Sequence, residues 1–231
     1  MNLKRALSYA TLGIGAAAAA DSLLGKKAGD LPPALEGLQR TYRWRGMDVA
    51  YTEAGDQDDP YLVLLHGLNA AASSGEWRTV FDTLSEEYHV VAPDLPGYGR
   101  SDRPPIRYSA AFYEEFVQDF LAEYGGKDDD GDLTVFATSL SAAYTAHAAE
   151  TVDVSRLVLV SPTTTAGPGS QQPWVRELLR FPLVGQTLFN LVTSKPAIEF
   201  FNADHGYADP SSVDDECQAY EWPTAHQENA R

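Results

Sequence analysis

The sequence has a single cysteine, Cys217, among its 231 residues. One cysteine cannot form an internal disulfide, so a hydrophobic core must hold the fold together in any redox compartment. The sequence also lacks the cysteine and histidine spacing that binds zinc. We therefore expect neither a metal nor a cofactor. The length is sufficient for one large α/β domain.

Basic residues are scarce: there are 17 Lys and Arg and 33 Asp and Glu, which gives a formal net charge of −16. This balance argues against nucleic acid as a partner. The acidic clusters are typical of a solvated surface, and they resemble those of proteins from salt-loving organisms, where salt screens the repulsion between carboxylates. A calcium site in residues 128–132 is an alternative, although the run lacks the spacing and the terminal Glu of an EF-hand loop.

The amino end lacks an uncharged run of the about 18 residues that a membrane-spanning helix needs. Residues 6–20 are uncharged and rich in alanine, and they follow Lys4 and Arg5. Three interpretations stay open: a signal peptide, a short membrane anchor, or a helix that lies on the domain. The location is accordingly open between the cytoplasm and a membrane-associated or exported form, with residues 6–20 as the possible membrane contact.

From residue 38 onward, strand-like and helix-like apolar patterns alternate. Two alternating strands around Arg45 and Gly46 predict a hairpin. Strands and helices then follow in turn over residues 61–67, 76–88, 89–94, 108–124, 133–138, 140–150 and 155–162. This order predicts an α/β fold with a mostly parallel, doubly wound sheet of about six strands. We divide the chain into an apolar segment with linker (1–37), a core (38–162) and a helical cap (163–231).

Ser139 occupies the very short junction between the strand 133–138 and the helix 140–150. Reactive groups of a parallel sheet belong at the carboxyl ends of its strands. A junction this tight strains the serine backbone and exposes its hydroxyl, and the residues two positions before and after must be small. Ala137 and Ser141 meet that requirement, although the usual pattern has glycine at both. The pattern predicts that Ser139 is a catalytic nucleophile.

The run "LLHGLN" at residues 64–69 follows the first long buried strand. A backbone N–H just after His66 and Gly67 can point at the reacting oxygen. We assign the oxyanion hole to the N–H groups of Leu68 and Leu140, and each donor would stabilise the oxyanion by roughly 3 to 4 kcal/mol.

With these motifs in this order, residues 40–226 resemble the α/β-hydrolases that carry a helical cap. The resemblance rests on His66–Gly67, on "DLPGYGRSDRP" at 94–104 and on Ser139. In that loop, Asp94 and Arg100 are expected to hold the structure rather than to catalyse. Haloalkane dehalogenases and epoxide hydrolases of this fold use an aspartate in place of the serine. A serine instead implies that a small-molecule ester, thioester, amide or activated carbon–carbon bond is cleaved through an acyl-enzyme.

The resemblance also implies an acid and a histidine that activate the serine. The run "VSPTTTAGPG" offers no carboxylate, so we expect both residues, with the seventh and eighth strands, beyond Arg231. We expect His66 to hold the oxyanion loop. His66, His205 and His226 are candidate substrate or cap contacts, and the latter two are weaker candidates for the base. Alternatives are a non-catalytic ligand-binding module, and a cofactor-free oxygenase or perhydrolase. The oligomeric state is open.

Overall fold

The computed structural model describes residues 23, 27–124, 132–163, 182–206 and 215–230. The chain forms two compact units, one of residues 32–167 and one of residues 1–31 with 168–231. The run 6–20, which carries the membrane interpretations, lies outside the described residues, as does most of the acidic cluster 128–132. Among the residues that are described, no helix is long and apolar enough to cross a membrane, and no group of side chains could hold a metal ion.

The larger unit contains a six-stranded sheet with the order β1-β2-β4-β3-β5-β6. Strands β3 to β6 run parallel, whereas β1 and β2 form the predicted hairpin and β2 pairs antiparallel with β4. The strands are β1 (Leu38–Trp44), β2 (Met47–Ala54), β3 (Tyr61–Leu65), β4 (His89–Pro93), β5 (Thr134–Thr138) and β6 (Arg156–Val160). The mostly parallel α/β sheet predicted from the alternating pattern is therefore confirmed.

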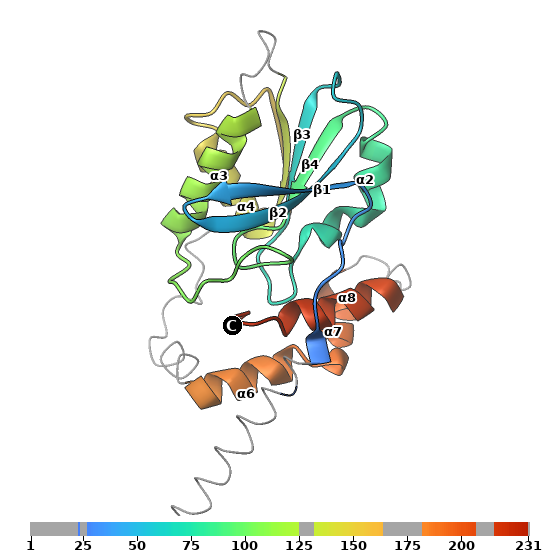
Figure 1. Cartoon of the computed structure of the whole chain (residues 1–231), viewed down its shortest axis with the longest axis vertical. Coiled ribbons are helices and arrows are strands. Elements are labelled where there is room, and N and C mark those ends of the chain that lie inside the picture. Colours follow the sequence, from blue (N-terminus) through green and yellow to red (C-terminus); the bar gives the residue numbers. More distant parts are fainter. Residues whose placement is uncertain (1–22, 24–26, 125–131, 164–181, 207–214, 231) are drawn as a thin grey trace, which may run out of the picture. The chain divides into compact units, whose positions relative to one another are not determined.

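Helices cover both faces of this sheet (Figure 1). One face carries α3 (Ala110–Tyr124) and α4 (Ser139–Ala148), and the other carries the 3-10 helix η1 (Ser74–Trp77) and α2 (Arg78–Leu84). Because neighbouring residues of a strand point to opposite faces, Val63 packs in the α3 and α4 core while Leu62 packs beside Phe81. Burial on both faces explains why β3 is apolar throughout.

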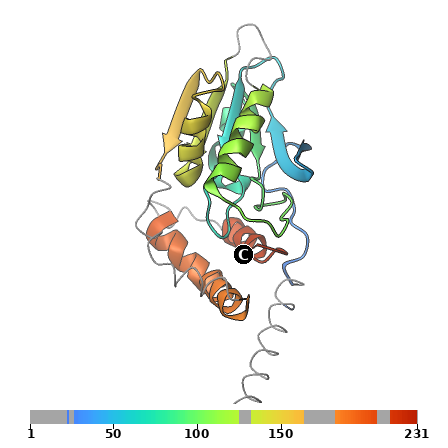
Figure 2. The same ribbon diagram turned by 90° about the vertical axis from the view of Figure 1, so that its left-hand side faces the viewer.

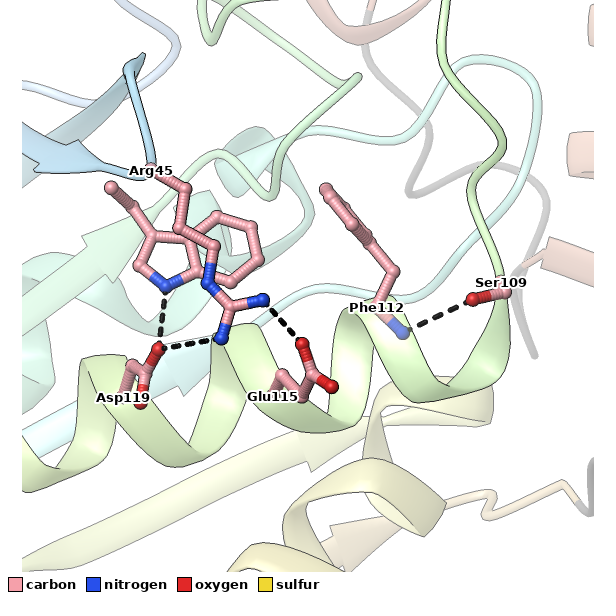
Figure 3. A network of polar contacts seen from close by, with 6 residues as sticks. Arg45, Ser109, Phe112, Glu115 and Asp119 are labelled. Atoms are coloured by element: carbon pink, nitrogen blue, oxygen red, sulfur yellow. Dashed lines mark hydrogen bonds and ion pairs between the residues drawn. The ribbon is translucent and has the colours of Figure 1, made fainter.

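A serine caps the first turn of α3, and tyrosines are buried on its inner face. The Ser109 hydroxyl accepts a hydrogen bond of 3.2 Å from the Phe112 N–H and so caps the first turn (Figure 3). The inner face of the helix is aromatic, and burial raises the pKa of Tyr113 and Tyr124 above the usual tyrosine range. The raised pKa values keep the phenol groups of Tyr113 and Tyr124 neutral in the folded protein.

The β1–β2 hairpin is fastened to α3 by its turn (Figure 3). The indole N–H of the buried Trp44 donates to Asp119 Oδ2 at 2.7 Å. The neighbouring Arg45 pairs with Glu115 and lies 3.6 Å from the same Asp119 oxygen. Arg45 has a φ of 47° and is followed by Gly46 at 87°, so the chain reverses direction between β1 and β2 at these two residues.

Strand β6 forms one edge of the sheet and the hairpin forms the other (Figure 2). No strand among the described residues pairs with the outer side of β6. Leu159 and Val160 are 37% and 42% exposed, whereas every residue of β4 is buried. Within the part of the chain that the structure describes, the β6 edge therefore has partly exposed apolar side chains and no neighbouring strand.

The described part of the smaller unit beyond residue 181 contains helices joined by turns and no strand, as predicted for the cap. It contains α6 (Pro182–Val192), α7 (Lys195–Phe201), a π-helical segment (Asn202–Gly206) and α8 (Asp215–Ala225). Phe200 and Phe201 on α7 are more than half exposed. Residues 164–181 of the predicted cap lie outside the described residues.

Candidate active site

Ser139 is the first residue of α4 and follows β5 without any loop. Its φ is 50°, while Thr138 before it is extended with a φ of −106° and a ψ of 153°. A non-glycine residue in this left-handed region costs roughly 1 kcal/mol or more. Ala137 and Ser141 are fully buried, so larger side chains at these positions would collide with the core. The junction is thus a strained turn that presents the half-buried Ser139 at the carboxyl edge of the sheet.

The end of β6 lies against the same turn. The Thr163 N–H donates to the Ser139 carbonyl at 3.1 Å, and the Thr163 hydroxyl oxygen lies 3.5 Å from Ser139 Oγ. Ser161, between β6 and Thr163, also has a positive φ, of 46°. Two strained serines therefore stand at the ends of neighbouring strands, as is common at functional sites. Sequence reasoning missed Thr163, because the pairing of β5 with β6 is what brings it to the serine.

Gly67 lets the chain after β3 approach the serine closely. A Cβ added at Gly67 would lie 3.2 Å from Ser139 Cβ and 3.2 Å from Thr138 Oγ1, which is tighter than ordinary contact. Leu68 comes directly after this close contact, and Leu140 directly follows the serine. The Leu140 N–H belongs to the first turn of α4, where backbone N–H groups have no partner inside the helix. Both residues assigned to the oxyanion hole are therefore near neighbours of Ser139 along the chain or across the sheet.

His66 is fully buried, and both of its ring nitrogens are used by the main chain. The Leu95 N–H donates to Nε2 at 2.9 Å, so the hydrogen of the neutral ring is on Nδ1, which donates to the Gly67 carbonyl at 2.7 Å. The ring thus joins the loop after β3 to the loop after β4. In this arrangement His66 holds the loop and offers no ring nitrogen to a substrate.

The loop after β4 is built around the buried carboxylate of Asp94. Asp94 accepts hydrogen bonds from the backbone N–H groups of Ser74 at 2.7 Å and Arg100 at 2.9 Å. Gly99 has a φ of 47°, and a Cβ there would lie 2.1 Å from Asp94 Cγ. The Arg100 guanidinium binds the Gln39 side chain at 2.5 Å. Asp94 and Arg100 therefore hold this loop together, which is the role expected from the sequence.

The strained serine after a parallel strand, next to an H–G loop, agrees with the resemblance seen in the sequence. The family model described as the alpha/beta hydrolase family matches residues 62–231. The chain belongs to this family. The mostly parallel sheet with helices on both faces is the fold that it shares with other alpha/beta hydrolases.

Individual relatives are similar over parts of the chain. A haloalkane dehalogenase of Bradyrhizobium diazoefficiens is 36% identical over 80 residues, which are 35% of this chain and 25% of the dehalogenase. A 2-hydroxy-6-oxo-6-(2'-aminophenyl)hexa-2,4-dienoic acid hydrolase of Metapseudomonas resinovorans is 32% identical over 107 residues, 46% of this chain and 35% of that protein. The matched segments thus span about a third or less of these curated relatives.

A solved structure agrees with this assignment of the fold. The CarC enzyme, a serine hydrolase involved in carbazole degradation, superposes with a TM-score of 0.62 at 21% identity. The match covers 85% of this chain and 66% of that one. At this level of identity the similarity establishes the fold, and the substrate needs separate arguments.

The remaining histidines of this alpha/beta hydrolase are distributed over several elements. His89 begins β4, at the opposite end of the sheet from Ser139, where its Nε2 lies 3.6 Å from Glu53 Oε1. His147 is exposed on α4, with its Nδ1 3.7 Å from Glu150. Within the described part of the larger unit, no histidine makes a hydrogen bond to Ser139.

The two cap histidines belong to the smaller unit. His226 is buried, its Nδ1–H donates to the Trp222 carbonyl at 2.8 Å, and its ring stacks on the Trp222 ring with 4.4 Å between the ring centroids. His205 lies in the π-helical segment, and its side chain is outside the described residues. A role in substrate contact or as the base stays a prediction for both.

Proposed function

We propose that this alpha/beta hydrolase is a serine hydrolase that cleaves an ester or a related acyl bond through an acyl-enzyme. The observation that carries the proposal is the left-handed backbone of Ser139, with a φ of 50°, at the junction of β5 and α4. Backbone strain of this kind is concentrated at active sites, where it holds a reactive side chain in an exposed position. Family membership makes nucleophilic attack the natural use for the hydroxyl.

In the proposed reaction, Ser139 Oγ bonds to the carbonyl carbon of the substrate while a base takes the hydroxyl proton. The carbonyl electrons move to the oxygen, which accepts hydrogen bonds from the Leu68 and Leu140 N–H groups. The bond to the leaving group then breaks, and the leaving group departs with the proton. Water releases the acid from Ser139 by the same steps. Each N–H contributes roughly 3 to 4 kcal/mol to the stability of the oxyanion.

We further propose that the base and the acid are carried by strands that continue the sheet at the outer side of β6. The support is the partly exposed Leu159 and Val160, since a sheet of this kind normally covers such side chains. The resemblance to other α/β-hydrolases places the acid and the histidine on strands that follow β6. None of the described residues of the larger unit supplies a histidine at Ser139.

The substrate class follows from the residue at the turn. The dehalogenase relative shows that this fold supports attack on haloalkanes, but the resemblance implies an aspartate there for that reaction. Ser139 forms an acyl-enzyme with an ester, thioester, amide or activated carbon–carbon bond instead. The similarity to a hydrolase whose name specifies a dienoic acid supports the carbon–carbon alternative within this class.

The second candidate is a ligand-binding module that keeps the site without turnover. One observation favours it: His66, the histidine nearest to Ser139 along the paired strands, has both ring nitrogens occupied. A serine without a base reacts slowly with acyl groups.

A fluorophosphonate probe separates the two candidates. We expect the probe to label the chain of residues 1–231 slowly, because the strained turn and the two N–H donors are present whereas the proposed base and acid are not, and we expect Ser139→Ala to abolish the labelling. Ser161→Ala is the matched control, because Ser161 is also a positive-φ serine at the end of a neighbouring strand. Labelling that survives in Ser139→Ala contradicts Ser139 as the nucleophile, and labelling that is absent from the parent chain at every salt concentration from about 0.1 to 3 M KCl favours the ligand-binding module.

A further inference from the structure

We propose that Glu76 and Ser141 are positioning residues that hold the peptide unit between His66 and Gly67, and that they thereby set the direction of the Leu68 N–H. The proposal rests on the proposed function of Ser139 and Leu68. It deepens that function, because it assigns two side chains that the nucleophile and the oxyanion donors do not include.

The peptide unit between His66 and Gly67 is hydrogen-bonded at both ends. The Ser141 hydroxyl donates to the His66 carbonyl at 2.6 Å. The Gly67 N–H donates to Glu76 Oε2 at 2.7 Å. Since the C=O and N–H of a trans peptide point in opposite directions, the two side chains hold the plane from opposite sides. Rotation of this plane would break at least one of the two bonds.

The next peptide unit contains the donor itself. The Gly67 carbonyl accepts from His66 Nδ1 at 2.7 Å, and this carbonyl shares its plane with the Leu68 N–H. The N–H therefore points away from the His66 ring. Glu76, Ser141 and His66 together determine the orientation of two successive planes. An oxyanion donor is effective when it is already aligned before the charge develops, so this orientation contributes directly to the rate.

The choice of residues fits this role. Position 141 is glycine in the usual pattern, and a glycine would leave the His66 carbonyl without the hydroxyl donor. Ser141 is fully buried, so its hydroxyl has no access to water as an alternative partner. Glu76 belongs to η1, and its carboxylate forms a charge-assisted bond that is stronger than a neutral one.

A positioning role of Glu76 and a direct effect of its negative charge predict opposite results when Glu76 is removed. Glu76 and Ser139 both lie close to Gly67. A Cβ added at Gly67 would be 3.5 Å from Glu76 Oε2 and 3.2 Å from Ser139 Cβ. A negative charge so near the serine disfavours an oxyanion, so charge alone would make removal of Glu76 beneficial. Positioning predicts the opposite sign, and glutamine keeps the acceptor oxygen while it removes the charge.

The first experiment follows the backbone amides by NMR in isotope-labelled chains of residues 1–231. We expect Glu76→Ala and Ser141→Ala to shift the Leu68 amide signal and to speed its hydrogen exchange, and Glu76→Gln to restore most of both. The controls are Glu87→Ala, an exposed glutamate, and Ser85→Ala, whose hydroxyl binds a backbone carbonyl at 2.7 Å elsewhere. A Leu68 signal that is unchanged in both test variants overturns the proposal.

The second experiment measures the rate at which the fluorophosphonate probe labels Ser139. We expect Glu76→Ala and Ser141→Ala each to lower the rate about tenfold or more, and Glu76→Gln to stay within about threefold of the parent. The double alanine variant should lose less than the product of the two single effects, because both residues hold one peptide unit. Equal or faster labelling of Glu76→Ala contradicts the positioning role. Absence of labelling in the parent contradicts the proposed function, while the amide signals still decide whether the two residues hold the peptide.

Discussion

Ser139 illustrates how the requirement for a hydroxyl and the preference of the backbone oppose each other at one residue. The left-handed φ of 50° would suit glycine, which has no Cβ to collide with the following carbonyl. A glycine, however, would lack the hydroxyl that the proposed reaction uses. The serine carries a conformational cost that the packing of the buried Ala137 and Ser141 around it must offset.

This opposition predicts that stability and reactivity change in opposite directions at position 139. Ser139→Gly should raise the free energy of unfolding by about 0.5 to 1 kcal/mol, since it relieves the strain, while it removes probe labelling. Ser139→Ala loses the same hydroxyl but keeps the Cβ, and so should show no such gain. Urea unfolding of the two variants and the parent measures the difference. Equal stabilities of the glycine and alanine variants would show that the backbone at this residue is unstrained.

Among secondary-structure elements, the contact of the β1–β2 hairpin with α3 combines a buried and an exposed interaction. The indole N–H of Trp44 is in a side chain only 3% exposed, and Asp119 is its acceptor. The ion pair of Arg45 with Glu115 lies at the surface, with both side chains more than half exposed. Removing the partner of a buried donor destabilises a protein more than removing the partner of an exposed charge. The Trp44 contact should therefore contribute more to the free energy of unfolding than the Arg45 contact.

We expect Asp119→Ala to lower the free energy of unfolding by about 1 to 3 kcal/mol, because the Trp44 N–H would be left buried without its acceptor. Arg45→Ala should cost about 0.5 kcal/mol or less. Asp119→Asn, which keeps an acceptor oxygen, should fall between the two. Denaturant unfolding monitored by tryptophan fluorescence gives the three values. The interpretation would be refuted by an Arg45 variant that loses as much stability as the Asp119 variant.

For the whole molecule, the dominant electrostatic fact is the formal net charge of −16. Asp94 is the only buried acidic residue within the described part of the chain, so the other described carboxylates lie nearer to water. Their mutual repulsion is strongest in the compact state and is weakened when salt shortens the range of charge interactions. The surface resembles that of proteins from salt-loving organisms, and we propose that salt stabilises the folded state of this protein.

We expect the midpoint of thermal unfolding to rise between about 0.1 and 2 M KCl, over which the screening length falls from about 10 Å to a few ångströms. A double variant, Glu86→Gln with Glu87→Gln, removes two negative charges at exposed positions and should show a smaller salt response. Calorimetry across the salt series tests both statements. A midpoint that is independent of KCl would show that repulsion between carboxylates contributes little to the stability.

Much of the fold and part of the site were predictable because they depend on local pattern. The alternation of apolar strands with amphipathic helices required a doubly wound sheet, and the absence of room between residues 138 and 140 required a sharp turn at Ser139. The pairing of strands could not be deduced in the same way. Periodicity shows which face of a strand is buried, but it does not show which strand lies beside it.

By itself, the sequence determined the order of elements and the family, and it predicted the serine at the tight turn, because each of these depends on neighbouring positions. Only the tertiary structure decided which side chains hydrogen-bond to the backbone next to Ser139. The pairing of β3 with β5 brings Ser141 of α4 to the peptide unit between His66 and Gly67, and the contact of η1 with β3 brings Glu76 to the same unit. Hydrogen bonds of this kind act over about 3 Å, so their partners become known only when the chain is folded.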